Sequence, residues 1–196
     1  MTDRVVGEQG DVLLDAAERV LLAEGLPGLS VRRVTAEAGV NVAAVNYVFG
    51  GKDALLRALL RRLLRPVTEE RISRIDTLVA AGHPTVAELV EAFVEPLMTL
   101  HQRLGSQFGE LLVRLPQDED QLRTSGGSAL EPGIERMLDA LAPVLPDLPR
   151  DILRLRLGML IGTVIAYTVG VVRLESLDES AELKELLAFV TAGLAA

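Results

Sequence analysis

Apolar residues recur at intervals of three and four along most of the chain, a period that is typical of amphipathic helices. The pattern predicts an all-α protein with about nine helices, separated by links that contain Gly or Pro. We expect these helices at residues 8–24, 31–38, 42–48, 51–81, 84–104, 105–115, 132–145, 150–176 and 181–195. Residues 1–7 are expected to be disordered, and the polar segment 116–128 to form a loop.

Residues 30–52 read as two short helices joined by a tight turn. Ser30 suits the N-cap of the first helix, because its hydroxyl can accept a backbone N–H bond. Gly39 suits the left-handed backbone of the turn, and Asn41 suits the N-cap of the second helix. That second helix, residues 42–48, presents only small side chains, an amide and a phenol. A helix with so little bulk can enter the DNA major groove, which is about 12 Å wide. The pattern therefore predicts a helix-turn-helix.

The same periodicity predicts buried faces and helix ends. The expected inner faces of the first two helices comprise Val12, Leu13, Ala16, Val20 and Ala23, then Val31, Val34 and Ala38. Gly25 is expected to end the first helix. We expect a kink or a break at Pro66 and a kink at Pro96, because proline removes a helical N–H. Pro84 is expected at the first position of its helix.

These segments resemble the DNA-binding domain of the TetR family of regulators. The matching motifs are Ser30-Val-Arg-Arg-Val, Ala38-Gly-Val-Asn-Val-Ala-Ala-Val-Asn-Tyr-Val-Phe-Gly-Gly-Lys52 and Asp53-Ala-Leu-Leu56, preceded by Leu14-Asp-Ala-Ala-Glu. The stretch Val42–Tyr47 is most similar to the branch that contains fatty-acid-responsive regulators related to PsrA. The family's usual Tyr-His-Phe is Tyr47-Val48-Phe49 here, so one phosphate-contacting imidazole is missing.

The resemblance implies a three-helix DNA-binding domain at residues 1–50 and a helical ligand-binding and dimerisation domain at residues 51–196. It implies a double-stranded DNA operator as partner and a homodimer formed through the last two helices. The candidate DNA-binding residues are Ser30, Arg32, Arg33, Asn41, Val42, Ala43, Asn46, Tyr47 and Lys52.

Each candidate has an expected role at the DNA. Asn46 can hydrogen-bond a base edge or a phosphate, while small apolar side chains such as Val42 and Ala43 can contact a thymine methyl. Ser30, Tyr47 and Lys52 are expected to position the helix on phosphates, as the resemblance implies for Lys52. Arg32 and Arg33 are possible phosphate or base contacts. The alternative for Lys52 is an ordinary solvated lysine.

The net charge of −8 is unusual for a DNA-binding protein, but it is unevenly distributed. Residues 1–65 carry +1 and the remainder carries −9. This asymmetry indicates that a nucleic acid would bind at the N-terminal third and not at the rest of the chain. Because +1 is modest, affinity must come from placed contacts and two copies of the domain more than from a broad basic field.

The C-terminal helices suit association between subunits. Leu157–Val172 is a run of sixteen residues without a charge, shorter than the roughly 20 that a membrane span needs. We therefore expect no membrane insertion. Small residues recur every four positions in it, at Gly158, Gly162, Ala166 and Gly170, which allows another helix to approach closely. The last helix is amphipathic, with Leu183, Leu186, Leu187 and Val190 on one face.

A small-molecule pocket is plausible in the C-terminal domain. Its candidate lining residues are Phe93, Leu97, His101, Phe108, Leu112, Met159 and Tyr167, a set that suits an apolar effector. Together with Arg103 and Arg114, His101 is a polar candidate for binding an acyl carboxylate or thioester. Resemblance to the fatty-acid-responsive branch suggests acyl chains or acyl-CoA. The alternative is that most of these residues are ordinary core.

No catalytic constellation is apparent. The chain has no cysteine and two histidines, and neither histidine lies in a carboxylate cluster, so we expect no enzyme activity, no cofactor and no metal site. The acidic run Asp118–Asp120 is expected to be a solvated turn.

The preferred hypothesis is a cytoplasmic homodimeric repressor that binds a palindromic operator and is released by a small apolar effector. The alternative is a non-catalytic carrier of acyl or lipid-like molecules that has lost DNA binding. Activation instead of repression stays open.

Overall fold

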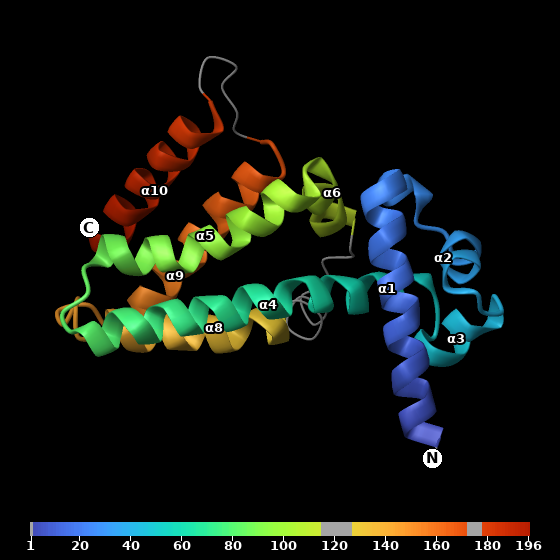
Figure 1. Cartoon of the computed structure of the whole chain (residues 1–196). Coiled ribbons are helices and arrows are strands. Elements are labelled where there is room, and N and C mark those ends of the chain that lie inside the picture. Colours follow the sequence, from blue (N-terminus) through green and yellow to red (C-terminus); the bar gives the residue numbers. More distant parts are fainter. Residues whose placement is uncertain (1, 115–126, 172–177) are drawn as a thin grey trace. The chain divides into compact units, whose positions relative to one another are not determined.

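The computed structural model describes residues 2–114, 127–171 and 178–196, and all its regular elements are α-helices (Figure 1). The helices are α1 (Thr2–Gly28), α2 (Val31–Ala38), α3 (Ala43–Phe49), α4 (Lys52–Ala81), α5 (Val86–Leu104), α6 (Ser106–Arg114), α8 (Gly127–Leu141), α9 (Arg150–Thr168) and α10 (Glu179–Ala195). The all-α prediction is confirmed. The loop expected over most of 116–128, with its acidic run, lies outside the described residues.

The described residues divide into two compact units. The first contains the chain up to Leu63 and the end of α6 from Glu110, and the second contains Leu64–Gly109 and the chain from Ser128 onward. The helix that begins at Lys52 therefore contributes residues to both units.

In the first unit, α1 packs against α2 and α3 (Figure 1). Three expectations for α1 are wrong. The helix begins at Thr2 instead of Glu8, and Val12 is 44% exposed. The buried stripe is Leu13, Ala16, Ala17, Val20 and Leu21, so Ala23 is also outside it. These positions repeat at three and four residues, and the apolar Val12 lies off that face.

Helix ends differ from the predictions where a specific capping interaction decides them. Gly25 has φ 71° and interrupts α1 as expected, although the helix bounds extend to Gly28. Pro84 is not the first residue of α5 as predicted, because the helix begins at Val86 after the N-cap Thr85, which forms a capping box with Glu88. The Thr85 hydroxyl accepts a hydrogen bond from the Glu88 N–H at 3.2 Å, and the Thr85 N–H donates to the Glu88 carboxylate at 2.8 Å.

The prolines do not break their helices. Both α4 and α5 are continuous through Pro66 and Pro96, so a break at Pro66 is wrong. The helix predicted at 132–145 instead runs from Gly127 to Leu141, with Pro132 inside it.

The helix predicted to reach Ser176 ends at Thr168. Gly170 adopts φ 75° and its N–H donates to Tyr167, while the Val171 N–H donates to Ala166 at 2.9 Å. This pair of bonds is the Schellman termination, which favours glycine at the left-handed position. Gly170 therefore lies outside α9 and does not extend its stripe of small residues.

The second unit is a helical bundle in which α8 lies beside α4 and α10 packs on α5 and α9 (Figure 1). The Thr68 hydroxyl donates to the Ala129 carbonyl at 2.7 Å, and Arg136 pairs with Asp76 at 2.5 Å. Its largest fully buried side chains are Phe93, Phe108, Ile75, Leu89, Met137 and Leu138. None of the described helices combines the length and the apolar character that crossing a membrane requires.

Candidate nucleic-acid interface and regulatory core

Local hydrogen bonds fix the turn between α2 and α3. The Ser30 hydroxyl accepts a hydrogen bond from the Arg33 N–H at 3.2 Å, which confirms the predicted cap. Gly39 adopts φ 68° and ψ 27°, and the N–H of Val40 donates to the Thr35 carbonyl at 3.0 Å. The residue at the N-cap of α3 is Val42 instead of the predicted Asn41, whose side-chain oxygen accepts from the Ala43 N–H at 2.8 Å just before the helix. These contacts set the direction in which α3 leaves the turn.

Helix α3 has one buried and one exposed side. Ala44 and Val45 are 7% and 0% exposed and attach the helix to the first unit. The exposed side carries the candidate residues Asn41, Val42, Ala43, Asn46 and Tyr47. Val42 is 48% exposed and Tyr47 is 68% exposed. The outer surface is therefore narrow and uncharged, with an amide and a phenol as its hydrogen-bonding groups.

The turn after α3 presents Lys52. Gly50 and Gly51 both adopt positive φ, 81° and 144°, conformations that favour glycine. The Gly50 N–H donates to the Asn46 carbonyl at 2.9 Å and closes α3. Lys52 is exposed at the first position of α4. A cation is unfavourable beside the positive end of a helix, so an anion placed opposite would be stabilised there.

Arg32 and Arg33 differ in availability. Arg33 pairs with Glu24 at 2.6 Å and with Glu37 at 3.1 Å, and the hydrogen bonds that it donates, first to Glu24 and second to Glu37, raise its pKa. Arg19 also bonds Glu37 at 3.0 Å, and these two arginines lower the pKa of that carboxyl. Arg32 is exposed, and no carboxylate in the described part of the chain pairs with it. Arg33 thus ties α2 to α1, and Arg32 is the better placed of the two for a partner.

Other arginines of α4 hold the fold together. Arg62 forms ion pairs with Asp15 and, at 3.6 Å, with Asp11 of α1. Arg65 pairs with Glu69 at 3.5 Å within α4. The Val48 side chain, at the position of the family's missing imidazole, is half-buried. A Cβ placed on Gly10 would lie 3.5 Å from its Cγ1.

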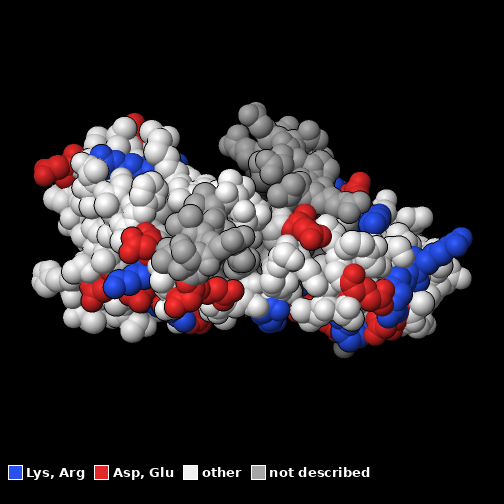
Figure 2. All heavy atoms as spheres, turned by 90° about the horizontal axis from the view of Figure 1, so that it is seen from above, with Lys and Arg blue, Asp and Glu red and all other residues white. Residues whose placement is uncertain are grey.

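Basic and acidic side chains are interspersed on the molecular face seen in Figure 2, without a continuous basic field. This agrees with the charge of only +1 over residues 1–65. Placed contacts must therefore supply most of the attraction to a polyanion.

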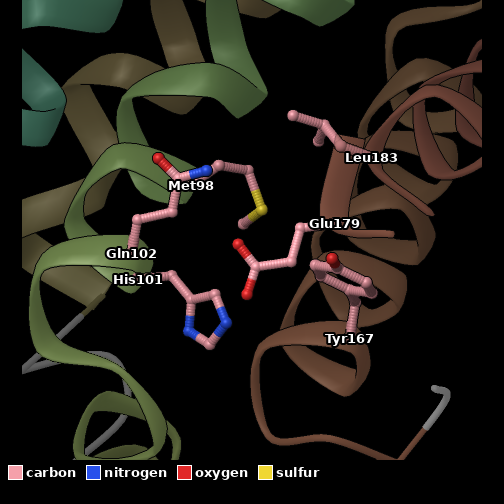
Figure 3. Close-up of a pocket in the computed structure, with 6 residues that line it drawn as sticks. All are labelled: Met98, His101, Gln102, Tyr167, Glu179 and Leu183. Atoms are coloured by element: carbon pink, nitrogen blue, oxygen red, sulfur yellow. The ribbon is translucent and has the colours of Figure 1, made fainter. Parts of the chain in front are cut away.

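The candidate pocket residues separate into three groups. Phe93, Leu97 and Phe108 are no more than 6% exposed and belong to the core, while Leu112 is half-buried. His101 and Tyr167, each 8% exposed, line a small crevice together with Met98, Gln102, Glu179 and Leu183 (Figure 3). Met159 is 62% exposed and joins neither set, because its position on α9 faces away from the core. The sequence interpretation missed Gln102, Glu179 and Leu183. The available signal was the spacing of three and four residues between positions 98, 101 and 102 and between positions 179 and 183, which places each set on one face of its helix.

The crevice is small and acidic. Its volume of about 20 Å³ is enough for little more than one water molecule. The Tyr167 hydroxyl donates to the Glu182 carboxylate at 3.2 Å, and the Tyr167 ring meets the His101 ring edge-on, with centroids 6.2 Å apart. Figure 3 shows the His101 imidazole and the Glu179 carboxylate facing each other. These carboxylates disfavour an acyl carboxylate at His101.

Arg71 is a buried cation that the sequence interpretation missed. Its side chain is 3% exposed, its Nε donates to the Phe93 carbonyl at 2.6 Å, and its guanidinium lies 4.0 Å above the centre of the Phe93 ring. Burial lowers the pKa of Arg71 to about 9. The signal was its spacing of four and seven residues from the buried Val67 and Leu64.

Helix α9 exposes an apolar stripe. Leu155 is 55% exposed and Met159 is 62% exposed, with Ile152 and Ile165 at 36% and 37% on the same helix. Gly158 and Gly162 are also exposed, and a Cβ on either would meet nothing within 4 Å. On α10, Phe189 is 69% exposed. Large apolar side chains clustered in this way mark a surface that another protein surface can cover.

Comparison with known proteins agrees with this architecture. Residues 13–59 match the domain described as "Bacterial regulatory proteins, tetR family", and residues 91–193 match the "Tetracyclin repressor-like, C-terminal domain". The HTH-type transcriptional regulator BetI of Vibrio vulnificus is 35% identical over 71 residues, which are 36% of each protein. BetI of Burkholderia lata is 29% identical over 125 residues, 64% of this chain and 57% of that protein. The chain thus spans little more than a third of the length of the Vibrio relative.

Solved structures share the fold over nearly the whole chain. A putative TetR-family regulator from Mesorhizobium loti has a TM-score of 0.63 at 18% identity, covering 97% of this chain and 96% of its own. The fatty acid degradation regulator FadR from Bacillus halodurans has a TM-score of 0.66 at 18% identity, with coverage of 95% and 96%. At these identities the likeness concerns the fold. The C-terminal match alone spans more than half of the residues, and the chain belongs to the TetR family of bacterial regulatory proteins.

Proposed function

We propose that the protein is a homodimeric, DNA-binding transcriptional repressor that covers a palindromic operator. The observation that carries the proposal is the exposed side of α3, where small residues flank Asn46 and Tyr47 while Ala44 and Val45 anchor the opposite side. A slim helix held firmly from behind is the arrangement that reads base edges in the major groove. Operator binding would place the protein in the cytoplasm.

The roles of individual residues follow from their chemistry. Asn46 contacts a base edge, and Val42 and Ala43 lie against thymine methyl groups. Exposed hydrogen-bond donors at Tyr47 and Lys52 position α3 on phosphates. Arg32 supports this contact more readily than Arg33, which is engaged with Glu24 and Glu37.

The rest of the DNA contact depends on the cap and the turn. The Ser30 hydroxyl already accepts the Arg33 N–H and can still donate to a phosphate. Asn41 serves chiefly to hold the turn before α3, because its side-chain oxygen accepts from the Ala43 N–H.

Dimerisation through α9 and α10 completes the proposal. The exposed apolar stripe around Leu155 and Met159 and the exposed Phe189 support it, since burying this surface in a second copy would remove it from water. Two-fold symmetry presents two copies of α3 and therefore requires a palindromic or near-palindromic site.

An effector would act on this arrangement through α4. Helix α4 begins at Lys52 and continues into the second unit, so a molecule bound among the second-unit helices can bias the spacing of the two DNA-reading helices. It can do so only through different affinities for the two spacings. We propose a small, largely apolar effector of the acyl class. The structurally similar FadR of Bacillus halodurans is a regulator of fatty acid degradation, which supports this choice.

Selection of DNA from a random pool with the full-length protein tests the proposal. Enrichment of a two-fold-symmetric site supports it. Failure to enrich any site, with lipid-like molecules retained by the protein in native mass spectrometry, would favour the non-catalytic carrier instead. The proposal includes no catalytic role, and measurable turnover of a bound molecule would contradict that part.

A further inference from the structure

The guanidinium of Arg71 is incompletely satisfied. It has five N–H donors, of which the one on Nε donates to the Phe93 carbonyl at 2.6 Å. The four N–H groups on the two Nη atoms meet no acceptor among the residues that the structure describes, and no described carboxylate pairs with the charge. With only 3% of the side chain exposed, water can replace these partners only in small part.

A buried charge of this kind is costly. Removing a cation from water is compensated by a carboxylate or by a full set of hydrogen bonds, and Arg71 has one carbonyl and one aromatic face. Burial lowers its pKa to about 9, so the guanidinium still carries its charge at neutral pH. An anion that reaches the Nη atoms would therefore meet a positively charged fork with little access to water.

The surroundings of Arg71 suit the apolar part of a ligand. The Phe93 ring lies against the guanidinium, and Leu97 continues the same buried face of α5. On the α8 side the neighbour is Gly133, where an added Cβ would lie 3.7 Å from the Arg71 Cδ. This is an ordinary van der Waals distance, so α8 approaches Arg71 closely at a glycine. The crevice near His101 offers the opposite electrostatics, because Glu179 and Glu182 border it.

We propose that Arg71 is the anion-binding residue of the effector site, and that it binds the carboxylate of an amphiphilic effector whose apolar body packs beside Phe93. This inference rests on the proposed ligand-responsive function and specifies its chemistry. The planar guanidinium binds a carboxylate through two parallel N–H bonds, which a neutral amide of the same shape cannot match.

The position of Arg71 also links this contact to α4. Its bond to the Phe93 carbonyl ties α4 to α5 in the absence of effector. A carboxylate that draws the guanidinium toward itself competes with this tie, so the ligand favours an arrangement in which α4 is less firmly held. This difference between the two states is what a ligand needs in order to shift the equilibrium.

Calorimetric titration of the full-length protein without DNA tests the inference with two probes, dodecanoate and its neutral counterpart dodecanamide. The wild type is expected to bind dodecanoate at least about tenfold more tightly than dodecanamide, since a charged bidentate bond exceeds a neutral one. Arg71→Met is expected to abolish this preference, because it should lower the affinity for dodecanoate much more than the affinity for dodecanamide. The matched control is Arg74→Met, one turn further on α4, where the native arginine already pairs with Glu70 and Glu95. It should keep the preference.

Three results would overturn the inference: equal binding of both probes by the wild type, binding of neither probe, or an unchanged preference in Arg71→Met. A purely structural arginine would lower the melting temperature of Arg71→Met without altering the ratio of the two affinities. If Arg71→Met fails to fold, the wild-type comparison still decides, and Arg71→Lys, which keeps the charge without the fork, should lower the preference several-fold. Because these titrations contain no DNA, their failure leaves the outcome of the operator selection untouched.

Discussion

Helices α3 and α9 both expose apolar side chains, but the two surfaces differ in their polar groups. The exposed side of α3 pairs Val42 and Ala43 with the amide of Asn46 and the phenol of Tyr47. The exposed stripe of α9 runs through Leu155, glycines and Met159 without such groups. A surface with hydrogen-bonding groups among small residues suits a polar partner such as DNA, and a purely apolar stripe suits another protein surface.

The largest expected effect comes from placing a charge on the α9 stripe. Leu155→Glu would bury one carboxylate from each subunit in the proposed dimer interface and should weaken dimerisation by about 100-fold or more. Sedimentation velocity over a range of concentrations measures this, and operator affinity should fall with it. Val79→Glu is the matched control, since Val79 is also exposed, at 41%, but lies on α4. If Leu155→Glu remains dimeric, the interface lies elsewhere.

On α3 the comparison predicts an effect on DNA affinity without an effect on assembly. Tyr47→Phe removes one hydroxyl from each subunit and should weaken operator binding by about tenfold. Lys52→Ala should also make the slope of the log binding constant against the log salt concentration shallower by about one per subunit. Gel shifts across salt concentrations measure both. Wild-type affinity and slope for both variants would show that the phosphate roles are wrong.

Arg32 and Arg33 are adjacent on α2, but within the described ranges only Arg33 pairs with carboxylates. Substituting each in turn therefore separates an effect on DNA binding from an effect on stability. Arg33→Ala removes the ion pairs with Glu24 and Glu37 and should lower the melting temperature. Arg32→Ala should leave the melting temperature nearly unchanged and weaken operator binding by several-fold. The reverse pattern would mean that Arg33 leaves its partners to contact DNA.

The turn that aims α3 should depend on its glycine. Gly39→Ala forces an L-residue into φ 68° and should cost about 1 kcal/mol of unfolding free energy, although a Cβ there meets nothing within 4 Å. Gly7→Ala, within helix α1 and equally open, should instead stabilise by about 0.5–1 kcal/mol. Urea unfolding measures both changes in unfolding free energy. If both substitutions stabilise or both destabilise, the left-handed backbone of Gly39 is not what decides the effect.

The smallest effect concerns pH and lies away from both surfaces, at the start of α5. Hydrogen bonds from the Thr85 N–H and hydroxyl lower the pKa of Glu88 below its ordinary 4.5. When folding lowers the pKa of a carboxyl group, that group stabilises the protein at a pH above its ordinary pKa. This stability is lost as the pH falls through the lower pKa of the folded state. Thr85→Ala should therefore be less stable than the wild type at pH 7, and the difference should shrink below pH 4.5. A difference that is constant with pH would contradict the capping-box account.

The sequence predicted the helix-turn-helix well because its determinants are local. The Ser30 cap, the left-handed Gly39 and the bond from the Ala43 N–H to the Asn41 side chain act within a few residues of their own positions. The second unit was less predictable, because its determinants come from distant segments. Whether Met159 faces the core or the surface depends on how α9 packs, and the burial of Arg71 depends on Phe93 in another helix. The start of α5 was misjudged because Pro84 is a strong local signal, whereas the nearby capping box was stronger.

The central claim is that the exposed side of α3 reads bases in two symmetry-related copies. Repeating the selection from random DNA with Asn46→Ala, beside the wild type, tests it most directly. The account predicts that the wild type enriches a two-fold-symmetric sequence and that Asn46→Ala relaxes or changes the same base position in both half-sites. An identical consensus for both proteins, or an asymmetric site for the wild type, would contradict it.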